Sequence, residues 1–69
     1  MEFEQSVLEM VRPFLNSGTA EFYNGTLFLE NVSGENGRFI YDLLLDEFGA
    51  DNFRFNIYNP VNGFVVDFI

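Results

Sequence analysis

One pattern of segments occurs twice in this chain and limits the folds that the chain can adopt. A stretch with helical spacing of apolar residues ends at a glycine, and two short runs of alternating apolar and polar residues follow it. In each copy, the turn between the two runs contains the pair Asn-Gly. The length of the chain indicates one domain over residues 1–69. Although few positions are identical between the copies, the shared order of segments indicates two αββ half-repeats, 1–32 and 33–69.

The first helical stretch has one apolar face. Its apolar side chains follow the period of a helix: Phe3, Val7, Met10, Val11, Phe14 and Leu15. Pro13 lies within this stretch, where its ring removes a backbone hydrogen bond and clashes with the preceding turn. Because Pro13 falls on the polar face, where a bend is easiest to accommodate, we expect a helix over residues 3–16 that is kinked near Pro13. The alternative is a helix that ends at Val11 and is followed by a separate turn.

The second helical stretch is expected over residues 36–48. Ser33 or Asn36 is suited to cap its start, and Gly49 is suited to end it in a left-handed conformation. Its predicted buried stripe consists of Ile40, Leu43, Leu44 and Phe48. The opposite, polar stripe consists of Glu35, Arg38, Asp42 and Asp46.

Four runs with a period of two predict strands over residues 19–23, 26–32, 52–58 and 64–69. Asn24-Gly25 favours a tight hairpin turn, because both positions of that turn need a positive φ. The face predicted to lie against the helices carries Phe22, Leu27, Leu29, Phe53, Phe55, Ile57, Phe64, Val66 and Phe68. The outer face carries, among charged residues, Tyr23, Phe28, Val32, Tyr58, Val65 and Ile69.

The order α-β-β-α-β-β favours an α+β fold. We expect a two-layer α/β sandwich, in which a four-stranded, mainly antiparallel sheet has two helices on one face. This order is similar to a circular permutation of the ferredoxin-like arrangement, which implies that the second and fourth strands are central. Both of these strands carry apolar residues on their two faces, as central strands can. The first strand is short, as edge strands often are.

The residue types that are missing argue against most enzymatic and metal chemistry. The hydroxyl groups have no histidine or lysine to activate them, so nucleophilic catalysis is not expected. Without histidine or cysteine, sites for zinc, iron or copper are not expected. A faint calcium-loop spacing lacks the charge and the glycine of a true calcium loop: Asn31, Ser33, Glu35 and Asp42. We therefore expect a protein that is not an enzyme and has no metal or other cofactor.

The charge of the chain limits its partners. Eleven acidic residues against Arg12, Arg38 and Arg54 give a net charge of −8. Nucleic acids and anionic membranes bind clustered lysine and arginine, so neither is an expected partner. The chain shows no signal-peptide pattern, and no apolar run reaches the ~20 residues that span a bilayer. We expect a soluble, cytoplasmic protein.

Two surfaces are candidates for binding a partner. The first is the polar stripe of the second helix, which Phe39 and Leu45 flank as partly exposed apolar residues: Glu35, Asp42, Asp46, Phe39 and Leu45. We expect this surface to bind a basic protein, as an inhibitor or a mimic of nucleic acid. The second is the outer sheet face, where an apolar patch would join copies of the chain into a homodimer with a structural or accessory role: Phe28, Val32, Val65 and Ile69.

Simple salt should stabilise this domain near neutral pH. Its acidic groups repel one another, and about 0.15 M salt screens charges that are more than about 8 Å apart. We expect the melting temperature to rise when NaCl is added to a dilute buffer. A melting temperature that stays constant or falls would show that the acidic groups are locally paired or too far apart to repel.

Overall fold

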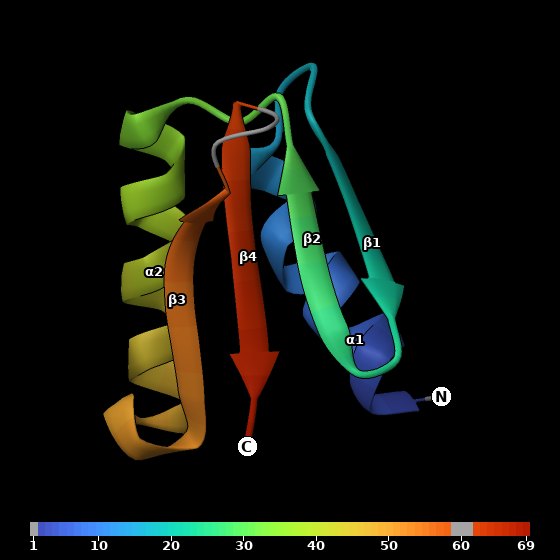
Figure 1. Ribbon diagram of the computed structural model, residues 1–69, viewed down its shortest axis with the longest axis vertical. Helices are drawn as coiled ribbons and strands as arrows, with labels where there is room; N and C mark the ends of the chain where they lie inside the picture. Colours follow the sequence, from blue (N-terminus) through green and yellow to red (C-terminus); the bar gives the residue numbers. More distant parts are fainter. Residues whose placement is uncertain (1, 59–61) are drawn as a thin grey trace.

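The computed structural model describes residues 2–58 and 62–69 of the chain. Its elements are α1 (Glu2–Val11), η1 (Arg12–Phe14), β1 (Thr19–Tyr23), β2 (Thr26–Glu30), α2 (Gly34–Phe48), η2 (Ala50–Asn52), β3 (Phe53–Tyr58) and β4 (Gly63–Phe68), where η marks a short 3-10 helix (Figure 1). The predicted α+β class and the order α-β-β-α-β-β are confirmed.

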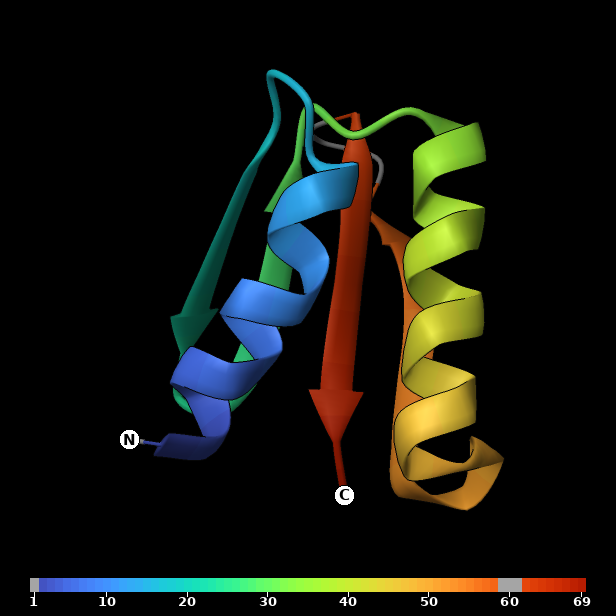
Figure 2. The same cartoon turned by 180° about the vertical axis from the view of Figure 1, so that it is seen from behind.

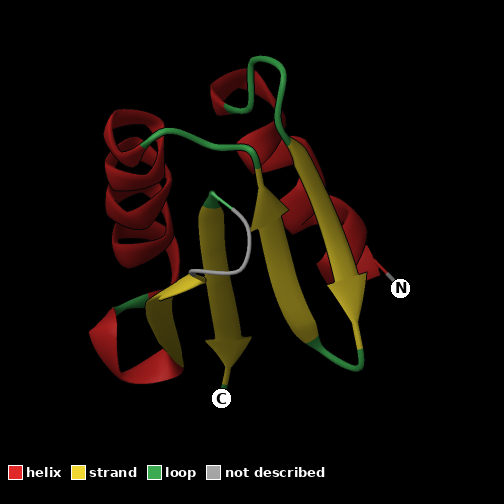
Figure 3. Cartoon of the chain, turned by 45° about the horizontal axis from the view of Figure 1, so that its top comes forward, coloured by secondary structure: helices red, strands yellow, loops and turns green. Residues whose placement is uncertain are grey.

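The four strands form one antiparallel sheet with the order β1-β2-β4-β3. β2 and β4 are central, as the permuted ferredoxin-like order implies. Both α-helices lie on the same face of the sheet, with α1 over the half that contains β1 and β2 and α2 over the half that contains β3 and β4 (Figure 2). The two layers are also visible in an oblique view, with both α-helices behind the sheet (Figure 3).

The first helix is shorter than the kinked helix that we preferred. α1 ends at Val11, and η1 follows with Pro13 as its second residue. Pro13 has no N–H to donate, and its ring would clash with the carbonyl of Glu9, so the α-helical ladder stops before it. The predicted kinked helix over residues 3–16 is wrong, and the alternative that ends at Val11 is confirmed.

The second helix begins at Gly34, two residues before its predicted start. The side-chain oxygen of Ser33 accepts a hydrogen bond from the backbone N–H of Asn36 at 3.1 Å, which satisfies a donor that the first helical turn leaves open. At the other end, Gly49 has a φ of 86°, which favours glycine. Its ψ of 153° lies outside the left-handed helical region that the sequence predicted.

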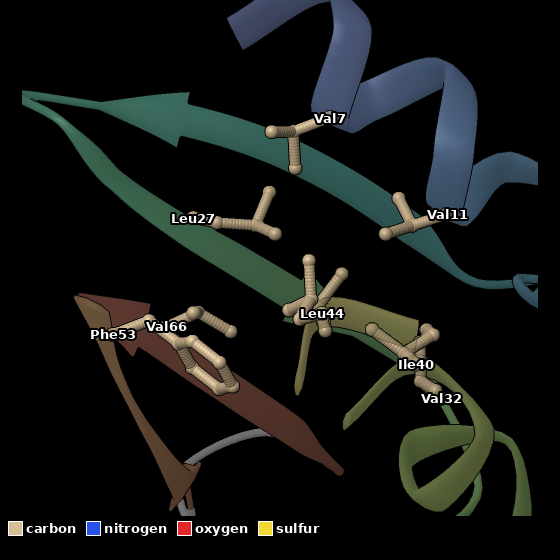
Figure 4. Packing of buried hydrophobic residues seen from close by; sticks show 9 residues of the cluster. Val7, Val11, Leu27, Val32, Ile40, Leu44, Phe53 and Val66 are labelled. Carbon is tan, nitrogen blue, oxygen red and sulfur yellow. The ribbon is translucent and has the colours of Figure 1, made fainter. Parts of the chain in front are cut away.

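The core lies between the helices and the sheet (Figure 4). Its buried side chains come from both α-helices, from β2, β3 and β4, and from the loop after β2: Val7, Val11, Leu27, Leu29, Val32, Ile40, Leu44, Phe53 and Val66. Leu27 lies opposite Val66 in the register of β2 on β4. A slip of one residue between the two strands would place Leu27 and Val66 on opposite faces and turn one of them outward, so burial fixes this register.

Phenylalanines close one end of the core. Four rings meet there, one each from α1, β1, α2 and β4: Phe3, Phe22, Phe48 and Phe68. The contacting rings have centroids 5.2 to 6.4 Å apart, which is the distance range of favourable edge-to-face and tilted aromatic pairs. This cluster ties the two helices to the sheet.

Val32 differs from its predicted placement, and Ile57 is more exposed than its position on the helix side suggests. Val32 belongs to the core, because β2 ends at Glu30 and Asn31 takes a positive φ of 58°, which ends the alternation of faces before Val32. The predicted strand over 26–32 was therefore too long. Ile57 is on the helix side of the sheet, as predicted, because it lies opposite Phe64, but it is 71% exposed because β3 is an edge strand that α2 covers only in part.

The close approach of α2 to β4 can be tested at Gly37. A Cβ atom at Gly37 would collide with the ring of Phe64, and that ring also packs against Phe55 at a centroid distance of 5.2 Å. We expect Gly37→Ala to lower the free energy of unfolding by about 1–3 kcal/mol through overpacking, measured by urea denaturation.

Gly34→Ala is the matched control in the same helix. A Cβ atom there has no described atom within 4 Å. The variant should therefore keep its stability or gain up to about 1 kcal/mol from the better helix propensity of alanine. Equal stabilities of the two variants would contradict the close packing of α2 on Phe64.

Candidate interaction surface

The solvent-facing side of α2 carries the predicted acidic stripe. Glu35, Asp42 and Asp46 are all exposed, whereas Ile40 and Leu44 on the opposite side of the helix are buried. At a rise of 1.5 Å per residue, the three carboxylates extend along about 16 Å of the helix. The stripe is therefore a continuous surface that the helix presents to water.

One arginine lies within this stripe. The Nε of Arg38 is 3.4 Å from Oδ1 of Asp42, and the two side chains are 76% and 56% exposed. An ion pair as open to water as this contributes roughly 0–1 kcal/mol. No other ion pair is found among the described residues, so Glu35 and Asp46 have no cationic neighbour that neutralises them there.

Phe39 lies beside the acidic side chains on the helix surface. It follows Glu35 by four residues and precedes Asp42 by three, and these spacings make the three side chains neighbours. Its ring is 49% exposed, and its centroid lies 6.1 Å from that of Phe14 in η1. Leu45 is half-buried and packs against the core, so it offers less open surface than Phe39.

The C-terminal end of α2 adds to the negative potential of this surface. Asp46 and Glu47 are exposed in the last turn, which has no basic residue. The open carbonyl groups of a helix end carry a partial negative charge of their own, so acidic residues are disfavoured there by a few tenths of a kcal/mol. A cation would be attracted both by the carboxylates and by the helix end.

The outer face of the sheet brings together only part of the predicted apolar patch. Phe28 and Val65 are direct neighbours in the register of β2 on β4. The ring of Tyr58 extends the patch, with its centroid 5.9 Å from that of Phe28. Sequence reasoning placed Tyr58 on this face without including it in the patch.

Two residues of the predicted patch are absent from it. Val32 is buried in the core, as described above. Ile69 is exposed, but it follows the end of β4 and lies four residues from Val65, which is about 13 Å along a strand, with Asp67 between them. The prediction that Val32 lines the patch is therefore wrong, whereas Ile69 is exposed but lies apart from Phe28 and Val65.

A polar pocket that the sequence did not reveal lies where α2 begins. Its volume is about 200 Å³, and its lining is mostly amide and hydroxyl side chains: Leu15, Asn16, Ser17, Asn31, Ser33, Asn36 and Asn62. Asn16 and Asn31 have φ values of 55° and 58°, which asparagine tolerates better than most residues. Asn16 and Asn31 therefore have turn roles and Ser33 has a capping role that account for their presence at this end of the molecule.

Comparison with protein-family models, curated proteins and solved structures finds no match to this chain. Within residues 2–58 and 62–69, no helix combines the length and the apolar character needed to cross a bilayer. In the same described part of the chain, acidic side chains do not gather in groups of three that could hold a metal ion. The geometry of the surfaces above is thus the basis for a proposal about function.

Proposed function

We propose that this protein is a non-enzymatic interaction protein that binds a basic protein partner through the acidic stripe of α2. The observation that carries the proposal is the half-exposed ring of Phe39 between the carboxylates of Glu35 and Asp42. Buried aromatic anchors supply most of the affinity in protein interfaces, and the charges around them raise the association rate and select the partner.

The same surface supports a more specific role as an inhibitor. Proteins that bind nucleic acids present clustered basic side chains to the phosphates. A helix with carboxylates along about 16 Å can occupy such a surface as a mimic of the nucleic acid.

We also propose a cytoplasmic location, because secreted domains of this size usually carry disulfides and this chain has no cysteine.

The stripe can be tested with a partner that is captured from native extract at low salt and released at high salt. Asp42→Asn/Asp46→Asn should slow association about threefold to tenfold at low salt, because it weakens electrostatic steering. Phe39→Ala should instead speed dissociation about tenfold, because it removes the apolar anchor. Surface plasmon resonance with the purified partner measures both rates.

Glu9→Gln/Glu21→Gln is the control for net charge. It also removes two negative charges, but from exposed positions on α1 and β1, away from the stripe. We expect this variant to associate at nearly the rate of the unmodified protein. The proposal is contradicted if the stripe variant associates at that rate in low salt, or if both double variants are slowed equally.

A second candidate function is a homodimer formed through the outer sheet face. The adjacency of Phe28 and Val65, with Tyr58 against Phe28, favours it. If this patch joins two copies, sedimentation should show a dimer that persists in high salt, and Phe28→Glu/Val65→Glu should give a folded monomer. An unmodified protein that is already monomeric at high micromolar concentration would exclude this interface.

A further inference from the structure

The edge strand β3 leaves backbone groups open on one side. The N–H of Ile69 donates to the carbonyl of Asn52 at 2.9 Å, so the backbone groups of Arg54, Asn56 and Tyr58, at every second residue after Asn52, point to β4. The N–H and C=O groups of Phe53, Phe55 and Ile57 therefore point away from β4, to the free edge of the sheet. For Phe55 and Ile57, no hydrogen-bond partner on that side is found in the described part of the chain.

Ile57 adds an uncovered apolar side chain to this edge. It lies opposite Phe64 in the strand register and therefore on the helix-covered side of the sheet, yet it is 71% exposed. Tyr41 of α2 covers the strand nearer its start, with ring centroids 5.9 Å from Phe53 and 5.4 Å from Phe55. α2 thus shelters β3 as far as Phe55 and leaves Ile57 open.

An additional strand beside β3 would have α2 next to its helix-side residues. In the views from both sides, α2 lies at the outer side of β3, at the edge of the sheet (Figures 1 and 2). A fifth strand would lie about 4.8 Å beyond β3, where its helix-side residues would meet the flank of α2. That flank carries the half-buried side chains of Tyr41 and Leu45.

The opposite edge of the sheet does not offer the same surface. The two-residue turn after Tyr23 directs the backbone groups of Ala20 and Phe22 to the open side of β1. On the helix side, however, both residues are half-buried, and the ring of Phe22 packs against Phe3 and Phe68. β1 therefore has open backbone groups but no open apolar side chain on the helix side, since its exposed Tyr23 lies on the outer face of the sheet.

The charges around β3 favour a cationic occupant. Of the two arginines nearby, Arg38 is paired with Asp42, whereas Arg54 lies opposite Asp67 in the strand register but forms no ion pair within the described part of the chain. Asp51, in the turn before β3, has no ion-pair partner among the described residues. The whole chain carries a charge of −8, so a second copy would be repelled from this edge and a basic segment would be attracted.

We propose that the free edge of β3 pairs with an extended segment of a basic protein, in which lysine or arginine alternates with apolar residues. The backbone of this segment would bond to Phe55 and Ile57, and its apolar side chains would pack against Ile57 and the flank of α2. This inference rests on the proposed function, because it assigns to the same basic partner the conformation in which it binds.

Amide hydrogen exchange measured by NMR tests the pairing directly. The probe is a blocked peptide of alternating lysine and valine, as long as β3. The control peptide has proline in place of valine, which keeps the charge but removes every second N–H. The first peptide should slow exchange at Phe55 and Ile57 about tenfold or more, and the control peptide should not. Unchanged exchange at these two amides, or equal slowing at Ala20 and Phe22, would overturn the proposal.

A pair of variants tests the same edge by affinity. Ile57→Pro removes an outward N–H without removing a bond to β4, and Ile57→Val keeps both the N–H and an apolar side chain. The proline variant should bind the lysine–valine peptide about tenfold more weakly, and the valine variant should bind it as the unmodified protein does. Equal affinities of the two folded variants would overturn the proposal; if the proline variant does not fold, the exchange measurement decides.

The two peptides separate this inference from the proposed function. If both bind equally, and both are weakened by Asp42→Asn/Asp46→Asn, a basic partner binds the stripe of α2 and strand pairing is wrong. If neither binds at low salt, both proposals are wrong. A dimer that Ile57→Pro dissociates would identify a second copy as the occupant of the edge and would overturn the inference.

Discussion

The pairing of β2 with β4 is the contact on which the rest of the structure depends. It joins two hairpins, each of which has its own helix, and it places Leu27 opposite Val66 and Leu29 opposite Phe64. A single hairpin is at best marginally stable in water, and a domain of about 60 residues buries only about 60% of its extended-chain surface. The apolar side chains of each half are therefore buried largely by the other half, within one continuous core.

This core determines which surfaces remain for a partner. It occupies the inner sides of both helices and one face of the sheet, and no charged side chain is buried among the described residues. The acidic residues are consequently left on the outside, where their mutual repulsion opposes folding. The outer side of α2 carries the carboxylates and Phe39, whose ring packs towards Phe14 of η1, and the opposite flank of α2 packs against β3 through Tyr41.

Local sequence patterns were sufficient to predict much of the fold. A helix that packs against a sheet has one buried side, so the 3.6-residue period identified Ile40 and Leu44 as core and Asp42 as surface. The turn at Asn24-Gly25 has the positive φ values that its sequence predicts, and it fixes the register of β1 on β2. The same reasoning found the acidic stripe, because exposure on a regular helix follows from position alone.

The errors occurred where one residue or a distant segment decides the outcome. At Pro13, a continuing apolar stripe favoured a longer helix, and the missing N–H stopped it. At Asn31, one positive φ moved Val32 from the outer face into the core. The exposure of Ile57 and the contact of Phe39 with Phe14 depend on strand order and on the path of η1, which no local pattern specifies.

Native-state hydrogen exchange of the free protein tests most directly whether β2 and β4 unite the two halves. The account predicts that the amides of Leu27, Leu29 and Val66 exchange only through global unfolding. Their opening free energy should then equal the free energy of unfolding obtained with urea. An opening free energy for the hairpin of β1 and β2 that differs from that of the hairpin of β3 and β4 would show that the halves unfold independently, which would contradict the account.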